Sequence, residues 1–197
     1  MKRQRLVSQR SLSRMFQEAA EAWKRLDYQQ SIDTLERAAS LDPANVSIQL
    51  DLGRAYGMRY DYSGAERCLE KAVRVSTRRA ETLAEAGRRC QEFGNSEMAR
   101  RYFERAVEQK DATADVFLTL AEINERRAQP EEADQLVERA LKLDTAHPPA
   151  RLVRARLDRL AGRLDEAESR VRALVKSASS DPWWGRCWYE LGEILRI

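Results

Sequence analysis

The feature that most constrains this chain is a spacing of 34 residues that recurs along its length. Four columns of small or apolar residues keep this spacing, in one register, over five consecutive repeats. The columns are Ala19, Gly53, Gly87, Ala121 and Ala155; Ser31, Ala65, Ala99, Ala133 and Ala167; Leu35, Leu69, Phe103, Val137 and Val171; and Ala38, Ala72, Ala106, Ala140 and Leu174. A fixed period of this length indicates an array in which each repeat is one small stacked unit.

Each repeat has the pattern of two helices joined by a short turn. In the second repeat the pattern consists of Leu52, Gly53 and Tyr56 in the first helix and Ala65, Leu69 and Ala72 in the second. The turns are predicted at residues 26–28, 60–62, 94–96, 128–130 and 162–164. Glycine inside a helix costs about 1 kcal/mol relative to alanine, so a recurring helical glycine indicates close helix packing. We therefore expect burial at helix crossings for Gly53, Gly87, Ala121, Ala65, Ala99 and Ala133.

This pattern resembles the tetratricopeptide repeat, W-x2-L-G-x2-Y followed by A-x3-F, A and P. The second repeat supplies most of the motif, and the first supplies Pro43. The resemblance covers residues 12–197 and implies an all-α, right-handed superhelical solenoid of antiparallel helix pairs. The expected divisions are a basic N-terminal tail (1–11), five repeats (12–45, 46–79, 80–113, 114–147 and 148–184) and a half repeat (185–197). The fifth repeat departs from the pattern, with Arg154 in the column of Leu52 and Leu174 where alanine is usual.

The last residues match the first half of the motif as Trp188-x2-Leu191-Gly192-x2-Leu195. Gly192 follows Ala155 by 37 residues, and no second helix follows it. A terminal cap normally has a polar outer face, whereas this helix is apolar on more than one side. We therefore expect a chain cut from a longer protein rather than a cap. We also expect another molecule or following sequence to cover residues 184–197, which makes self-association possible.

The charge of the chain lies mainly at its N-terminus. The formal net charge is +3, and residues 1–17 contain five basic and no acidic side chains. The remaining residues are close to neutral, which argues against a surface for nucleic-acid phosphates. The basic tail could touch nucleic acid or acidic lipid, but we expect a disordered, solubilising tail.

Several classes of protein are not favoured by the sequence. No apolar stretch reaches membrane-spanning length, and the N-terminus lacks the apolar region of a secretory signal. The three dispersed cysteines suggest a reducing cytoplasm and form no metal-ligand spacing. The single histidine, His147, lies beside Pro148 in the turn between two repeats, and Cys90 occupies the Tyr56 column as a core residue. We therefore predict no catalytic residue, no cofactor, no metal and no membrane partner.

A binding role is favoured instead. In the family that the chain resembles, the first helix of each pair lines a concave groove. Carried over to this sequence, the groove residues are Phe16, Trp23, Leu50, Arg54, Ala84, Arg88, Leu118, Glu122, Leu152, Arg156 and Tyr189. An apolar strip flanked by charges suits an extended peptide or an amphipathic helix. The alternative is that part of the apolar column only packs successive repeats together.

Three functions stay open at this point. The first is a protein–protein interaction scaffold that binds a protein or peptide ligand. The second is a regulatory or substrate-presenting array of a larger enzyme, because "WYELG" resembles bacterial tetratricopeptide arrays fused to sulfotransferases. The third, nucleic-acid binding, is disfavoured by the near-neutral body. The matching columns also lack the Lys and Asn pair with which some family members bind acidic C-terminal tails.

Overall fold

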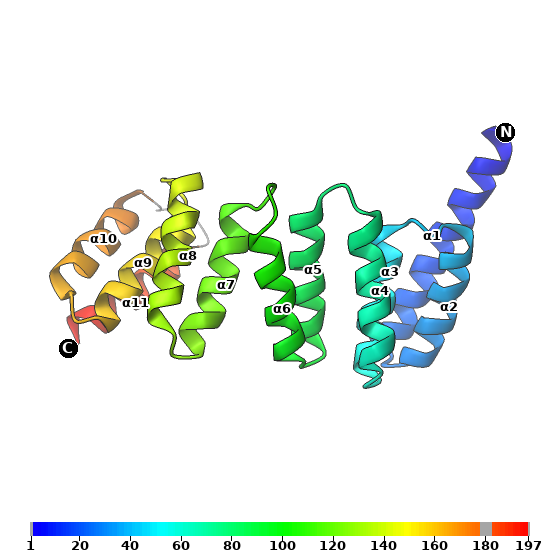
Figure 1. The fold of residues 1–197 in the computed structure, drawn as a ribbon, viewed down its shortest axis with the longest axis horizontal. Helices are drawn as coiled ribbons and strands as arrows, with labels where there is room; N and C mark the ends of the chain where they lie inside the picture. Colours follow the sequence, from blue (N-terminus) through cyan, green and yellow to red (C-terminus); the bar gives the residue numbers. More distant parts are fainter. Residues whose placement is uncertain (1, 178–182, 197) are drawn as a thin grey trace. The chain divides into compact units, whose positions relative to one another are not determined.

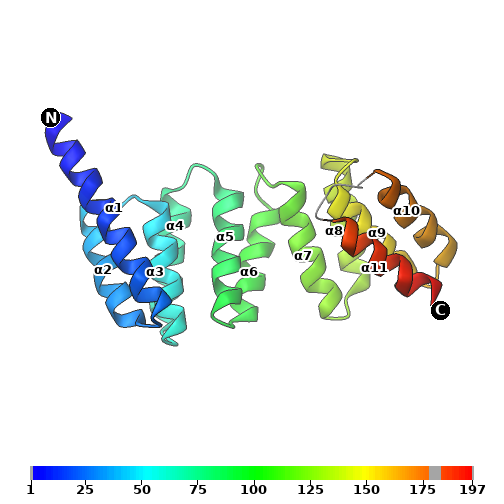
Figure 2. The ribbon, with the colours of Figure 1, turned by 180° about the vertical axis from the view of Figure 1, so that it is seen from behind.

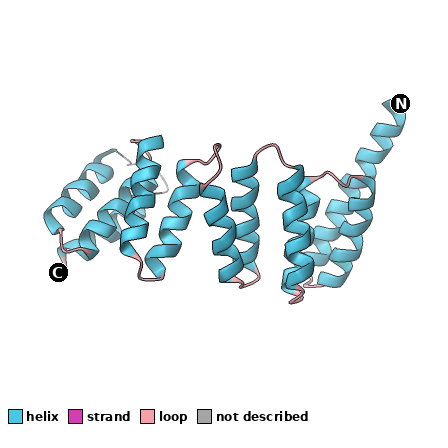
Figure 3. Cartoon of the chain, in the orientation of Figure 1, coloured by secondary structure: helices cyan, strands magenta, loops and turns pink. Residues whose placement is uncertain are grey.

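The computed structural model describes residues 2–177 and 183–196, with side chains from residue 11 onward. Every regular element in these ranges is an α-helix (Figure 3). The chain forms two compact units, unit 1 (Met1–Asp111) and unit 2 (Ala112–Ile197). The expected all-helical class is therefore confirmed.

Unit 1 consists of three helix pairs. Its helices are α1 (Lys2–Lys24), α2 (Tyr28–Leu41), α3 (Val46–Met58), α4 (Tyr62–Val75), α5 (Arg79–Glu92) and α6 (Ser96–Val107). Short turns join α1 to α2, α3 to α4 and α5 to α6, and each pair packs closely (Figure 1). The second helix of one pair packs on the first helix of the next, and α3 also packs directly on α5. The first helices of successive pairs therefore form one side of the unit.

Unit 2 consists of two pairs and a further helix. Its helices are α7 (Ala114–Arg126), α8 (Pro130–Leu143), α9 (Pro148–Leu160), α10 (Leu164–Ser177) and α11 (Trp184–Leu195). The helix α11 packs on α10 and on α9, as a first helix of a following repeat does (Figure 2). The five expected helix pairs and the single last helix are thus all present among the described residues.

The four columns of the 34-residue period form the cores of the two units. All twenty side chains or glycines in the columns are buried. A Cβ atom on Gly53 would lie 2.7 Å from Leu69 Cγ, and one on Gly87 would lie 2.8 Å from Phe103 Cε2. Small residues at these crossings therefore let the two helices of a pair approach each other closely. All six residues that the sequence predicted at crossings are buried.

The turn inside each repeat has the same backbone geometry. A residue with positive φ recurs every 34 residues: Leu26 (60°), Tyr60 (64°), Gly94 (81°), Ala128 (58°) and Gly162 (77°). The N–H of the residue after each of them donates to a carbonyl oxygen five residues earlier, at 2.9–3.0 Å. These are the hydrogen bonds of a Schellman helix end. In unit 1 the next helix is then capped by the side chains of Asp27, Asp61 and Asn95.

The N-terminal residues differ from the sequence expectation. Helix α1 begins at Lys2, so residues 2–11, expected as a disordered tail, form its first turns. The physical reason is that no glycine or proline precedes Pro43, so nothing in the local sequence stops a helix there. The division of the chain at the bounds given above stays a prediction.

The departures in the fifth repeat are accommodated by specific partners. Leu174 is buried and packs in one cluster with Cys187, Leu191 and Ile194 of α11. Arg154 lies largely buried on α9, and its guanidinium is 2.5 Å from Asp134 Oδ1 of α8. An ion pair to the preceding repeat therefore replaces the leucine contact at this position.

Candidate protein-binding surface

Two pockets on the first helices of unit 1 bring predicted binding residues together. Phe16 and Arg54 line a pocket of about 310 Å³ between α1 and α3. Leu50 and Arg88 line a second pocket of about 440 Å³ between α3 and α5. Each pocket combines an apolar side chain from one first helix with an arginine from the next first helix.

Arg54 is held in place by three neighbours. Its guanidinium lies 3.8 Å from the ring centroid of Trp23. At this distance the cation is attracted to the face of the aromatic ring. It also pairs with Asp51 at 3.3 Å and with Glu92 at 3.4 Å. The Trp23 side chain of α1 and the Glu92 side chain of α5 are thereby tied to the same residue of α3.

Arg89 belongs to this surface, although the sequence reasoning did not select it. Its guanidinium lies 3.1 Å from both Glu85 and Glu92 and 3.5 Å from Asp51. Burial raises the pKa of Asp51, while Arg54 and Arg89 act in the opposite direction. The i, i+4 spacing of Glu85 and Arg89 was the available signal, but the contact to Asp51 spans 38 residues and is not visible in the sequence.

Arg88 is the most accessible of the predicted arginines. About half of its side chain is exposed, and its Nε donates to Glu85 at 2.8 Å. This is a local i, i+3 pair on one helix, so a ligand carboxylate can replace Glu85 at small cost.

The aliphatic column lies deeper than the arginines. Leu50, Ala84, Leu118 and Leu152 are each at most 7% exposed. These side chains pack the helices together and offer little area to a ligand. Among the predicted residues of unit 1, Phe16 and Trp23 are partly exposed and offer apolar area to a ligand.

In unit 2 the predicted charged residues pair between first helices. Arg156 of α9 lies 2.5 Å from Glu125 of α7, and Glu122 of α7 lies 3.5 Å from Arg186 of α11. Arg159 of α9 pairs at 2.6 Å with Glu190 of α11, whose side chain is buried. These pairs link three first helices, and of the residues involved only Glu122 and Arg156 are among the predicted groove residues.

Helix α11 carries an exposed aromatic cluster. Trp184 and Trp188 are 42% and 47% exposed, and their rings meet edge to face with centroids 5.8 Å apart. Tyr189, predicted as a groove residue, is 69% exposed. A Cβ on Gly192 would meet no atom within 4 Å, in contrast to Gly53 and Gly87 at the same place in the motif. Residue 197 of this segment lies outside the described residues.

The groups with reactive chemistry have structural roles. Cys90 is fully buried, as expected, and burial raises the pKa of its thiol to about 12. His147 caps α9, because its Nδ1 accepts the Ala150 N–H at 3.3 Å and its Nε2 lies 3.1 Å from Asp115 Oδ1. Within residues 2–177 and 183–196, no group of three His, Cys, Asp or Glu is placed to hold a metal ion. None of the helices described there is long and apolar enough to cross a membrane.

The comparisons with known proteins agree with this geometry. The sequence model of one family, described as tetratricopeptide repeat, matches residues 126–185. A tetratricopeptide repeat protein from Parabacteroides merdae ATCC 43184 has a similar structure, with a TM-score of 0.66, 16% identity, and coverage of 94% of this chain and 72% of that one. The MamA protein gives 0.59 at 18% identity, with coverage of 86% and 92%. YrrB, described as a TPR protein with an unusual peptide-binding site, gives 0.57 at 21% identity, with coverage of 81% of each chain.

At such identities the likenesses establish the fold and nothing finer. No curated protein sequence matches the chain.

Proposed function

We propose that this chain, a tetratricopeptide-repeat protein, is a protein–protein interaction scaffold that binds a peptide or helix along its first helices. The observation that carries the proposal is the pair of pockets in unit 1. The partly exposed Phe16 lies with Arg54 in one pocket, and Arg88 lies with the largely buried Leu50 in the other. An apolar contact beside an arginine suits a ligand segment that alternates apolar and acidic side chains.

The two pockets differ in what they leave for a ligand. Arg54 already contacts Trp23, Asp51 and Glu92, so its main role is to hold the wall of its pocket in place. Within the described residues Arg88 pairs only with Glu85, and it is therefore the predicted arginine with most capacity to bind a ligand carboxylate.

The test is charge reversal at Arg88. A partner is first captured with the full chain and identified, and its affinity is then measured for the wild type and for Arg88→Glu. We expect binding to weaken at least about tenfold, which corresponds to about 1.4 kcal/mol. The matched control is Arg100→Glu, because Arg100 forms similar local pairs on the second helix α6.

Two outcomes bear on this proposal. Weaker binding by Arg88→Glu alone, at an unchanged melting temperature, supports the first-helix surface. Equal affinities of the wild type and both variants would place the binding site elsewhere.

A cytoplasmic, non-catalytic role is part of the same proposal. The burial of Cys90 supports only the non-catalytic part, because a buried thiol with a raised pKa is a poor nucleophile at neutral pH. The role as an array within a larger enzyme stays a prediction.

We further propose that α11 mediates self-association through its aromatic cluster. Contiguous exposed apolar surface commonly marks an interface, and Trp184, Trp188, Tyr189 and Leu195 are all at least 42% exposed. Light scattering should show a mass that rises with concentration, and Trp188→Glu should abolish the rise. A mass that stays monomeric for the wild type at every concentration would exclude this contact.

A further inference from the structure

Successive turns between first and second helices leave a crevice between neighbouring repeats. In unit 1, between the second and third repeats, this crevice is filled by Phe93. Its ring stacks on Tyr62 with centroids 5.8 Å apart and lies so close to α3 that a Cβ on Gly57 would be 2.2 Å from Phe93 Cδ1. Phe93 is only 7% exposed, so an aromatic ring is a stable occupant of this crevice.

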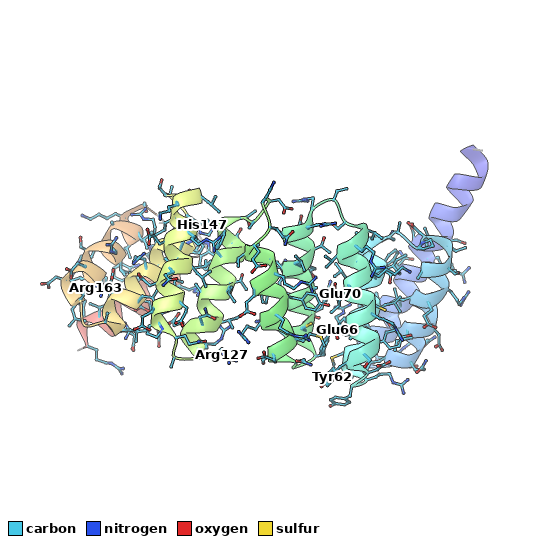
Figure 4. All side chains as sticks on the ribbon, viewed as in Figure 1. Tyr62, Glu66, Glu70, Arg127, His147 and Arg163 are labelled. Carbon is cyan, nitrogen blue, oxygen red and sulfur yellow. The ribbon has the colours of Figure 1, made fainter. Side chains whose placement is uncertain are left out.

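The equivalent crevice in unit 2 lacks such a ring. Two periods of 34 residues after Phe93, the chain has Ala161, and Pro130 takes the place of Tyr62. An open crevice of about 760 Å³ lies here, between the α7–α8 turn and the α9–α10 turn. Its apolar lining consists of Ala128, Pro130, Leu157, Leu160 and Ala161. Figure 4 labels Tyr62 at the start of α4 and Arg163 beside the α9–α10 turn, which mark the two crevices.

The crevice between the first and second repeats of unit 1 lies at the equivalent place but has a more polar lining. Residues 29, 32, 59 and 61 line it, three periods before residues 131, 134, 161 and 163 of the open crevice. Its volume is about 300 Å³, and Tyr56, Glu36 and Arg59 make much of its surface polar. The unit 2 crevice is therefore both larger and more apolar than the one between the first two repeats.

The rim of the open crevice is acidic. Its charged lining consists of Glu125, Glu131, Asp134 and Arg163. Glu125 and Asp134 already pair with Arg156 and Arg154, and Arg163 pairs with the buried Asp158. Glu131 is exposed in the first turn of α8 and has no ion-pair partner in the part of the chain that the structure describes.

Leu160 gives a further sign that the crevice is unfilled. Its side chain lines the crevice and is 57% exposed, although Leu157 one turn earlier is buried. A ring placed over Leu160 in this crevice would cover apolar surface that now faces water, and burial of that surface favours binding.

We infer that this crevice of unit 2 binds a partner peptide through one aromatic side chain with a lysine or arginine beside it. The ring packs against Pro130, Leu160 and Ala161, less deeply than Phe93 does in unit 1, because Glu125 stands where Gly57 leaves room for Phe93. The cation lies against Glu131. The site lies at the turns, apart from the first-helix pockets of unit 1, and so goes beyond the proposed scaffold surface.

The test is a titration of the isotope-labelled full chain with the capped peptide Gly-Lys-Phe-Lys-Gly, followed by NMR. We expect amide shifts concentrated in residues 125–135 and 157–163. Replacing the peptide phenylalanine by alanine, or its two lysines by glutamates, should weaken binding by about tenfold or more.

Variants of the protein test whether an aromatic ring is the group that fills such a crevice, as Phe93 does in unit 1. Ala161→Phe should fill the crevice from within and weaken peptide binding at least about tenfold. Ala146→Phe, which adds the same ring to an exposed position between α8 and α9, is the matched control and should leave binding unchanged. Phe93→Ala should add a second set of shifts around residues 57–66 and 89–95, and circular dichroism verifies that this variant is folded.

The inference is overturned by shifts that persist undiminished in Ala161→Phe, or by the absence of shifts at millimolar peptide. Shifts confined to α11 would assign the peptide to the exposed tryptophans instead. None of these results depends on Arg88 or on a captured partner, so the outcome is independent of the scaffold proposal.

Discussion

At the scale of single residues, five turn positions carry the same backbone conformation on different side chains. Glycine occupies two of the five positions with positive φ, whereas Leu26, Tyr60 and Ala128 occupy the other three. A left-handed conformation costs a residue with a Cβ roughly 1 kcal/mol or more relative to glycine. Each of these three turns therefore stores a little strain that the packing of the helix pair sustains.

Ala128→Gly should raise the free energy of unfolding by about 0.5–1 kcal/mol, because the turn then loses that strain. Gly162→Ala should lower it by a similar amount in the next repeat, where no atom lies within 4 Å of the added methyl group. Urea unfolding of both variants measures the two effects. Changes of the same sign would show that backbone conformation does not decide the stability of these turns.

The residues of the turns and crossings were predictable because their cause is local or periodic. Gly53 and Gly87 repeat at the same place in the pattern, and the structure brings each against the large side chain of its own pair. The positive φ of Leu26 and Tyr60 was not predicted, since neither residue favours that conformation. Only the 34-residue register, applied from Gly94 to the other turns, could have identified them.

At the scale of helices, successive first helices are joined by ion pairs as well as by apolar packing. Arg54 and Arg89 join α3 to α5, and Arg156 joins α9 to α7. The partners lie 31–38 residues apart, and the 34-residue period does not show which charges meet. Sequence reasoning therefore found the helices, whereas the side-chain contacts between them depend on rotamers that no pattern gives.

The contact of α11 with α9 is the clearest case for a test. Glu190 is buried and pairs with Arg159 at 2.6 Å, so Arg159→Met leaves an uncompensated charge in the interface. We expect a loss of roughly 3 kcal/mol in the free energy of unfolding. Adding Glu190→Leu removes that charge and should restore most of the loss. Thermal and urea unfolding check both variants, and a single variant as stable as the wild type would show that Glu190 is not desolvated.

At the scale of the whole molecule, the charge balance explains why the site was harder to predict than the fold. Charged residues make up 34% of the chain, yet the net charge is only +3. On the first helices most of the predicted charges meet an opposite charge, as Arg54 and Arg156 do. Recognition then depends on individual sites such as the exposed Arg88 and the crevice beside Glu131. The net charge of the chain does not indicate where these sites lie.

The predicted groove residues illustrate this difference. The sequence located them on the first helices, where they lie, but it could not separate buried from accessible members of one column. Leu50 and Tyr189 belong to the same predicted column, and the first is 6% exposed while the second is 69% exposed. Burial depends on what the neighbouring helices place over a residue, and this is decided by packing rather than by spacing.

The central claim is that a partner protein binds along the first helices, and hydrogen–deuterium exchange of the full chain with and without a captured partner tests it most directly. The result that we predict is slower exchange, on binding, in α3 and α5 around the pockets of Phe16, Arg54, Leu50 and Arg88, with α4 and α6 unchanged. Slower exchange confined to the second helices α2, α4 and α6 would contradict the claim.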